Sequence, residues 1–229
     1  MEDQGLQIPR QSATLRLLVE DKLRSAIASG HFKPGQRLVE RELCEQLGVG
    51  RTSIREALRQ LEAEGLITTL AHRGPVVTVI TYDEATQLYK VRALLEGFLG
   101  REFAEHGREE DIAALEVALK QFEKAARSGK RQDLAAAKTV FYNCLIDGAG
   151  NSFVRQMLTQ LHNRVTQLRI VSMTQPGRLK HSIEEIREIT AAIKNREPAR
   201  AAAACSRHVE MAAVTALDYL RKNGPEATG

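Results

Sequence analysis

Two short segments with a helical pattern of apolar residues are joined by a single tight turn, Gly48-Val49-Gly50. When residues 40–47 and about 51–64 are drawn as helices, their apolar residues fall on one seam. Two helices that share a seam across such a turn are held at a fixed angle, as in a helix-turn-helix. The seam consists of Leu43, Leu47, Val49, Ile54, Leu58 and Leu61.

The flanking segments extend this motif into a winged domain. Apolar residues recur at helical spacing before Gly30, which predicts a preceding helix. Two β-branched runs, residues 66–70 and 76–80, predict a β-hairpin. We therefore expect a winged helix-turn-helix of three helices and a hairpin over residues 12–80, after a disordered lead-in at residues 1–11.

From Tyr82 onward the pattern is helical throughout. Aromatic residues make up only 4% of the chain and Trp is absent, so Leu, Ile, Val and Ala must build the core, which suits helices. The predicted fold class is mainly α, with the winged domain followed by an all-α bundle at residues 81–224. The six predicted helices of the bundle span about residues 83–106, 109–128, 133–147, 152–172, 177–195 and 198–222.

The charge is only mildly basic, with a formal net charge of +4. Residues 1–80 carry 11 Lys and Arg against 10 Asp and Glu, so a nucleic-acid footprint must come from a local arrangement of charges. The three cysteines have no metal-like spacing, and no stretch approaches the roughly 18 apolar residues of a membrane span. We expect a cytoplasmic protein without a membrane partner.

The first turns of the second helix of the motif carry small hydroxyls and arginines. The N-terminal end of such a helix enters the major groove, where Arg reads guanine with two hydrogen bonds. The tip of the predicted hairpin adds a cation that reaches the minor groove or the flanking backbone. The sequence thus predicts contacts to double-stranded DNA from Arg51, Thr52, Ser53, Arg55, His72, Arg73 and Gly74.

A purely structural interpretation of the arginines is also open. Arg51 and Arg55 could be solvated helix residues that form ion pairs with Glu56 and Glu62. The glycine turn, the hydroxyl pair, the arginine pair and the following wing agree with one another, however, and this agreement favours DNA binding.

Several segments of this region are similar to the GntR family of regulators. They are residues 30–38, 48–58 and 61–67, together with Arg73-Gly74. In that family the positions that match Arg41, Arg51, Thr52, Ser53, Arg55 and Gly74 contact DNA. The chain departs from the family pattern at Val39 and Gly50, where a Ser-like helix cap is usual. Gly is an acceptable cap, whereas Val39 leaves the helix after it less well capped.

The bundle resembles the FCD domain of the FadR branch of that family, through residues 89–96 and the turn at 148–151. Many members bind a divalent metal through an Asp-x-x-x-His pair and two further histidines. The four matching positions are Lys138, Tyr142, Ile186 and His208, so only one His is kept. A Lys would repel a metal ion, and we therefore expect no bound metal and no cofactor.

The changed positions suggest a different ligand. Lys138 and Tyr142 share a helical face at i, i+4. With Arg92 and His208 they could bind an anionic small-molecule effector, Lys138 supplying the charge of the absent metal. In the alternative interpretation, Lys138 reaches out to solvent and Tyr142 fills the old cavity.

The combined prediction is a homodimeric transcription regulator that binds a pseudo-palindromic operator and responds to a small, carboxylate-type effector. One alternative is an architectural DNA binder whose bundle only dimerises. The other is a helical-bundle enzyme with an accessory DNA-binding domain. The sequence shows no nucleophile-base pair, no defensibly spaced pair of carboxylates and no phosphate-binding glycine loop, and we therefore predict that the chain is not an enzyme.

Overall fold

The structure, a computed structural model, describes residues 10–173 and 175–223. Its internal contacts divide the chain into two compact units, Met1–Val79 and Ile80–Gly229. The predicted lead-in lies mostly outside the described residues. It is wrong for Arg10 and Gln11, which already belong to the first helix because both residues favour helix and nothing stops the helix before Ser12.

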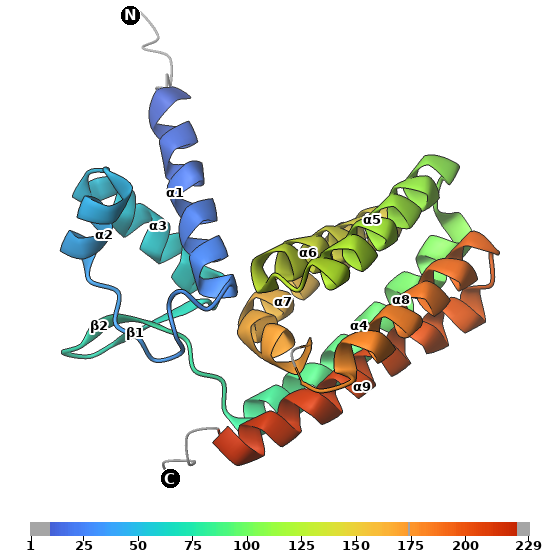
Figure 1. The fold of residues 1–229 in the computed structure, drawn as a ribbon. Helices are drawn as coiled ribbons and strands as arrows, with labels where there is room; N and C mark the ends of the chain where they lie inside the picture. Colours follow the sequence, from blue (N-terminus) through green and yellow to red (C-terminus); the bar gives the residue numbers. More distant parts are fainter. Residues whose placement is uncertain (1–9, 174, 224–229) are drawn as a thin grey trace, which may run out of the picture. The chain divides into compact units, whose positions relative to one another are not determined.

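The N-terminal unit contains three helices and a two-stranded antiparallel sheet, which confirms the predicted winged helix-turn-helix (Figure 1). The predicted second strand was placed too late. Leu70 pairs with Gly74 and Ile67 with Val77, so this strand ends at Val77. The elements are α1 (Arg10–Ala28), α2 (Glu40–Leu47), α3 (Arg51–Ala63), β1 (Ile67–Leu70) and β2 (Gly74–Val77).

The predicted seam holds α2 against α3. Leu43, Ile54 and Leu61 are buried in one apolar cluster, against which Leu47 and Val49 pack. The turn between the helices depends on Gly48, whose φ of 66° is left-handed and whose N–H donates to the carbonyl of Cys44. Residues with a side chain are strained in this conformation, so the glycine fixes the angle at which α3 leaves α2.

The C-terminal unit is all helical in its described part (Figure 1). Its first helix is well capped, because Thr81 and Glu84 form a reciprocal capping box. None of the described helices is long and apolar enough to cross a membrane. The helices are α4 (Tyr82–His106), α5 (Glu109–Ser128), α6 (Arg131–Gly148), α7 (Ser152–Met173), α8 (Arg178–Lys194) and α9 (Pro198–Asn223).

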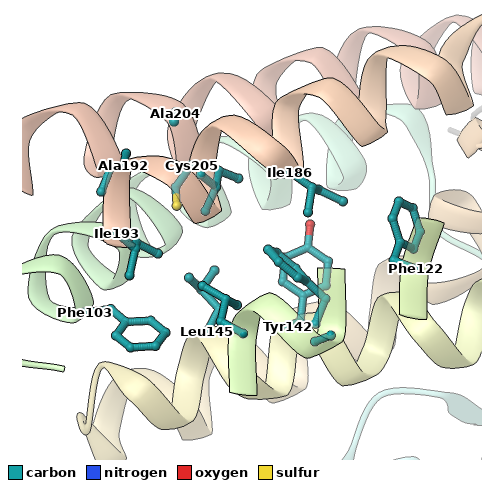
Figure 2. Packing of buried hydrophobic residues seen from close by; sticks show 14 of the residues in the cluster. Phe103, Phe122, Tyr142, Leu145, Ile186, Ala192, Ile193, Ala204 and Cys205 are labelled. Atoms are coloured by element: carbon teal, nitrogen blue, oxygen red, sulfur yellow. The ribbon is translucent and has the colours of Figure 1, made fainter. Parts of the chain in front are cut away.

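The apolar core of this unit lies between two sets of helices. Figure 2 shows Phe103 and Leu145, from α4 and α6, facing Ile193 of α8 and Cys205 of α9. Helices α4 and α9 run side by side (Figure 1) and approach closely at Gly100. A Cβ atom at this position would lie 2.7 Å from both the carbonyl oxygen of Ala201 and the Sγ atom of Cys205.

The close approach at Gly100 predicts that an alanine there destabilises the chain, the opposite of its usual effect in a helix. In a helix interior, Gly→Ala normally stabilises by up to about 1 kcal/mol. Here Gly100→Ala should instead lower the free energy of unfolding by about 1–3 kcal/mol, because the methyl group overpacks the α4–α9 contact. Urea denaturation measures the change. Arg101→Ala, at an exposed position on the same helix, should stay within about 0.5 kcal/mol of the parent chain. A stabilised Gly100→Ala chain would contradict this packing.

Candidate DNA interface and buried polar cluster

The N-terminal turn of α3 presents its predicted DNA-binding residues at the surface. Arg51, Thr52 and Arg55 are exposed, and Ser53 is half-buried. Gly50 caps this helix without a side-chain hydrogen bond, as expected from its missing hydroxyl. The first backbone N–H groups of α3 therefore have no side-chain acceptor at the cap, which suits an approaching phosphate.

A hollow of about 310 Å³ lies beside this turn. Three arginines line it, Arg37, Arg41 and Arg51, together with Pro75 of the wing. Arg37 was not predicted as a DNA-binding residue. Spacing in the sequence does not mark this residue, because it comes to lie beside the wing only through the β-bridge between Arg37 and Val76.

Arg55 has an ion-pair partner, but not one of those considered from the sequence. Its Nε atom donates to Oε2 of Glu40 at 2.9 Å, which links α3 to the first residue of α2. Glu62 instead accepts a hydrogen bond from the N–H of Thr69. The helix-based pairing with Glu56 and Glu62 is thus wrong for Arg55, because the turn folds α2 within closer reach.

The wing tip places His72 and Arg73 at the surface. His72 and Gly74 both have left-handed φ angles, 62° and 78°. Gly adopts this conformation without cost, whereas it is uncommon for His. With Gly74 paired to Leu70 in the sheet, the tip is short, and it projects an exposed Arg side chain beyond the last strand pair.

In the helical unit, the four predicted effector residues line one small cavity of about 10 Å³. They come from three helices: Arg92 from α4, Lys138 and Tyr142 from α6, and His208 from α9. Lys138 is only 2% exposed. The alternative in which it reaches out to solvent is therefore wrong, because the side chain is enclosed by the surrounding helices.

Lys138 is held by a chain of polar contacts. Its Nζ atom lies 2.9 Å from Nε2 of His208 and 3.4 Å from Oγ of Ser182. The opposite ring nitrogen of His208 contacts Glu185, which Arg178 binds with both Nη atoms. Since a carboxylate only accepts, Nδ1 of His208 donates to Glu185 and Nε2 accepts from Lys138.

A second buried ion pair forms the other side of the cluster. Arg92 and Glu96 are each 1% exposed, and two nitrogens of Arg92 donate to Oε1 of Glu96 at 2.9 and 2.6 Å. Arg92 also contacts the hydroxyl of Tyr142, and His162 contacts Glu96 at 2.9 Å. Glu96 was not predicted as a site residue, although its i, i+4 spacing from Arg92 indicates the pair.

Burial and mutual repulsion shift the protonation of this cluster. Burial lowers the pKa of His162 and of His208 to about 4, so both are neutral at pH 7. Burial also brings the pKa of Lys138 well below its usual value, and the charges of Arg169 and Arg178 add to the effect. Burial alone would raise the pKa of Glu96, but Arg92 and His162 outweigh it and keep this carboxyl ionised.

The cluster does not fit a metal ion. Within the residues that the structure describes, no group of three His, Cys, Asp or Glu side chains is arranged to hold one. The position of the second family histidine is Ile186, which is fully buried in the apolar core near Tyr142 (Figure 2). An amine stands at the position of the family carboxylate, so the donor set is cationic rather than anionic.

These features define a class: a two-domain transcriptional regulator with a winged helix-turn-helix and a helical C-terminal domain. The chain belongs to the GntR family. Residues 15–77 match the bacterial regulatory proteins of the gntR family, and residues 87–211 match the FCD domain. The predicted family and branch are thereby confirmed.

Named relatives support the same conclusion. The chain is 31% identical over 199 residues to a probable D-xylose utilization operon transcriptional repressor of Paenarthrobacter nicotinovorans, covering 86% of each chain. It is 30% identical over 183 residues to the HTH-type regulator YdhC of Bacillus subtilis, covering 79% of this chain and 82% of that one. Because the relatives are transcriptional regulators, the prediction that the chain is not an enzyme is confirmed.

Solved structures share the fold. The McbR/YncC structure of Escherichia coli superposes with a TM-score of 0.80 at 23% identity, covering 91% of this chain and 99% of that one. A GntR regulator structure from Rhodococcus sp. RHA1 gives a TM-score of 0.72 at 23% identity, with 92% and 99% covered. At this identity the likeness concerns the fold alone.

The two buried histidines predict a loss of stability in mild acid. Their pKa values are about 4 in the folded chain and near 6.5 when unfolded, so the unfolded chain binds more protons between these values. Stability should therefore fall as the pH drops from about 7 towards 4, by about 3 kcal/mol per histidine over the full interval. Thermal unfolding across this range measures the slope. His162→Gln should flatten it, whereas His31→Gln, at an exposed position, should not; equal slopes in both variants would contradict the assignment.

Proposed function

We propose that the chain acts as a homodimer that binds a pseudo-palindromic DNA operator, and that a small carboxylate in the helical domain controls this binding. The observation that carries the proposal is the surplus of buried cations around Lys138. Three arginines line the cavity with Lys138, and two carboxylates compensate two of them. A site of this composition suits an anion.

The DNA contact is proposed for the start of α3 and the wing. The exposed Arg51 and Arg55 would lie in the major groove, with Thr52 and Ser53 at phosphates or base edges. Arg37 and Arg41 beside Arg51 favour the backbone on the same side. The wing would add Arg73 and His72 next to Gly74. Local rather than bulk charge supports this proposal, since the chain carries a net charge of only +4.

The dimer is proposed to form through α4 and α7. Both helices expose large apolar side chains, among which Leu94 is 75% and Phe153 is 77% exposed. Val91 and Phe98 lie on the same face of α4 as Leu94, at helical spacing. Exposed apolar rows on helices that pack together are typical of protein interfaces, and a two-fold dimer uses one such face twice.

The effector is proposed to bind where Arg92, Lys138, Tyr142 and His208 converge. Lys138 has no described carboxylate within ion-pair distance, and its hydrogen bonds go to His208 and Ser182. An incoming carboxylate would supply the missing counter-charge and favour the protonated amine. The cavity has room for about one water, so binding would require the surrounding helices to separate.

This separation offers a route from the effector to the DNA-binding unit. Tyr89 lines the cavity and also belongs to the apolar cluster that Ile80 and Tyr82 pack against. A ligand that moves Tyr89 would therefore disturb the first residues of the helical unit, where the chain continues from the winged domain. A coupling of a few kcal/mol between two dimer geometries would suffice. A purely architectural DNA binder would gain nothing from a buried amine without a counter-charge, because burying such a group costs stability.

Operator binding tests the DNA half of the proposal. Fluorescence anisotropy with a site selected from random DNA should show that Arg51→Ala and Arg55→Ala each cost about 1–3 kcal/mol and relax the base preference. Lys124→Ala removes one exposed charge in the helical unit and should change little. The mass of the complex should correspond to two chains per operator. Equal losses on selected and random DNA, or one chain per site, would contradict the assignment.

Lys138→Met tests the effector half. Methionine fills the space of the side chain without the buried amine, but it also removes the hydrogen bonds to His208 and Ser182. These effects oppose each other, so the thermal stability without added ligand should change little. A carboxylate at about 100 times its dissociation constant should stabilise the parent chain by about 2.7 kcal/mol and the variant by much less. Lys120→Met, an exposed lysine on α5, is the matched control and should respond like the parent. Equal responses to a carboxylate panel in both variants would refute the role of Lys138.

A further inference from the structure

Two hydroxyl groups in the cavity have no hydrogen-bond partner. The hydroxyl of Tyr89, from α4, and that of Ser172, from α7, are both buried, and neither is paired within the described part of the chain. Both side chains line the cavity that contains Lys138. Buried hydroxyls are almost always hydrogen-bonded, since leaving one unpaired costs about 1–3 kcal/mol. Two hydroxyls on one cavity without a protein partner indicate that a further group binds in this cavity.

A third side chain in the same cavity is incompletely compensated. Arg92 and Arg178 each have a carboxylate partner, Glu96 and Glu185. Arg169 instead donates to the carbonyl of His162 and to Thr166, and its guanidinium lies 5.1 Å from the centre of the Tyr142 ring. It forms no ion pair with a carboxylate of the described residues. Arg169 therefore adds a positive charge beside the two free hydroxyls.

We propose that Tyr89 and Ser172 bind a hydroxyl group of the effector, next to the carboxylate that Arg169 binds, so that the ligand is a short-chain hydroxycarboxylate. This inference rests on the proposed carboxylate site. Lys138 and Arg169 hold the carboxylate, and the alcohol oxygen of the ligand accepts from one protein hydroxyl and donates to the other. An alcohol matches this pair because each of its partners is itself both a donor and an acceptor.

The size of the cavity limits the ligand. About 10 Å³ is free, which is too little for any organic acid. Even a small ligand must therefore displace α7, which carries Arg169 and Ser172, from the helices opposite. A ligand without a hydroxyl would enter the same space but leave Tyr89 and Ser172 unpaired. Sites built to pair with a ligand hydroxyl discriminate strongly against analogues that lack it.

The two unpaired hydroxyls make a prediction for the unfolding temperature of the chain. Since neither is paired in the free chain, Tyr89→Phe and Ser172→Ala should leave the unfolding temperature without ligand unchanged or raise it. Ser206→Ala is the matched control, because the hydroxyl of Ser206 donates to the carbonyl of Ala93 at 2.9 Å. Its loss should lower the unfolding temperature. A drop of similar size in Tyr89→Phe and Ser172→Ala would show that ordered water or structure already uses these groups, and would overturn the proposal.

Binding is measured by titration calorimetry on the full chain with two matched pairs of acids, lactate with propionate and malate with succinate. In at least one pair the hydroxy acid should bind about tenfold tighter or more than its partner. Tyr89→Phe and Ser172→Ala should reduce this ratio towards one, and Ser206→Ala should keep it.

The outcomes separate this inference from the function on which it rests. If carboxylates bind in a way that depends on Lys138 but without preference for the hydroxy acid, the hydroxyl reading fails and the carboxylate site stands. If none of the four acids binds, or if binding is indifferent to Lys138→Met, both proposals fail.

Discussion

The helical domain is organised around one buried amine. Lys138 is enclosed by apolar and cationic neighbours, and its hydrogen bonds go to a neutral histidine and a serine. His208 accepts from it only because Glu185 fixes the ring tautomer, and Glu185 is in turn held by Arg178. This chain of contacts is arranged like a metal ligand and its supporting carboxylate, with the amine of Lys138 in place of the ion. An anion is the natural complement of such a site.

Most of the fold was predictable because it depends on local pattern. The seam between α2 and α3 follows from apolar spacing, and Gly48 marks the turn because few other residues adopt its backbone conformation. The boundaries of the hairpin were not predictable from β-branched runs alone. They depend on register, and the pairing of Leu70 with Gly74 ends the second strand at Val77.

The site was predictable only in part. Lys138, Tyr142 and His208 were predicted from family positions and Arg92 as a further cation, and all four line one cavity in the structure. Tyr89, His162, Arg169 and Ser172 were missed because none of them has an oppositely charged residue one turn away on its own helix. Whether such a residue points to solvent or into a cavity is decided by helix packing. Spacing indicates it only where two oppositely charged residues share a face, as Arg92 and Glu96 do.

The polar groups of the cavity that lack a hydrogen-bond or ion-pair partner also bear on the proposed regulation. The free energy of the domain is raised by two hydroxyls without a protein partner, by Arg169, which has no ion pair among the described residues, and by the buried amine of Lys138. A ligand that satisfies them lowers the energy of whichever arrangement of α4 and α7 admits it, and only such differential binding shifts a conformational equilibrium. Tyr89 belongs both to this cavity and to the cluster around Ile80 and Tyr82. In the proposed mechanism, a ligand that pairs these groups would therefore favour one arrangement of Tyr89 and of the residues around Ile80 and Tyr82.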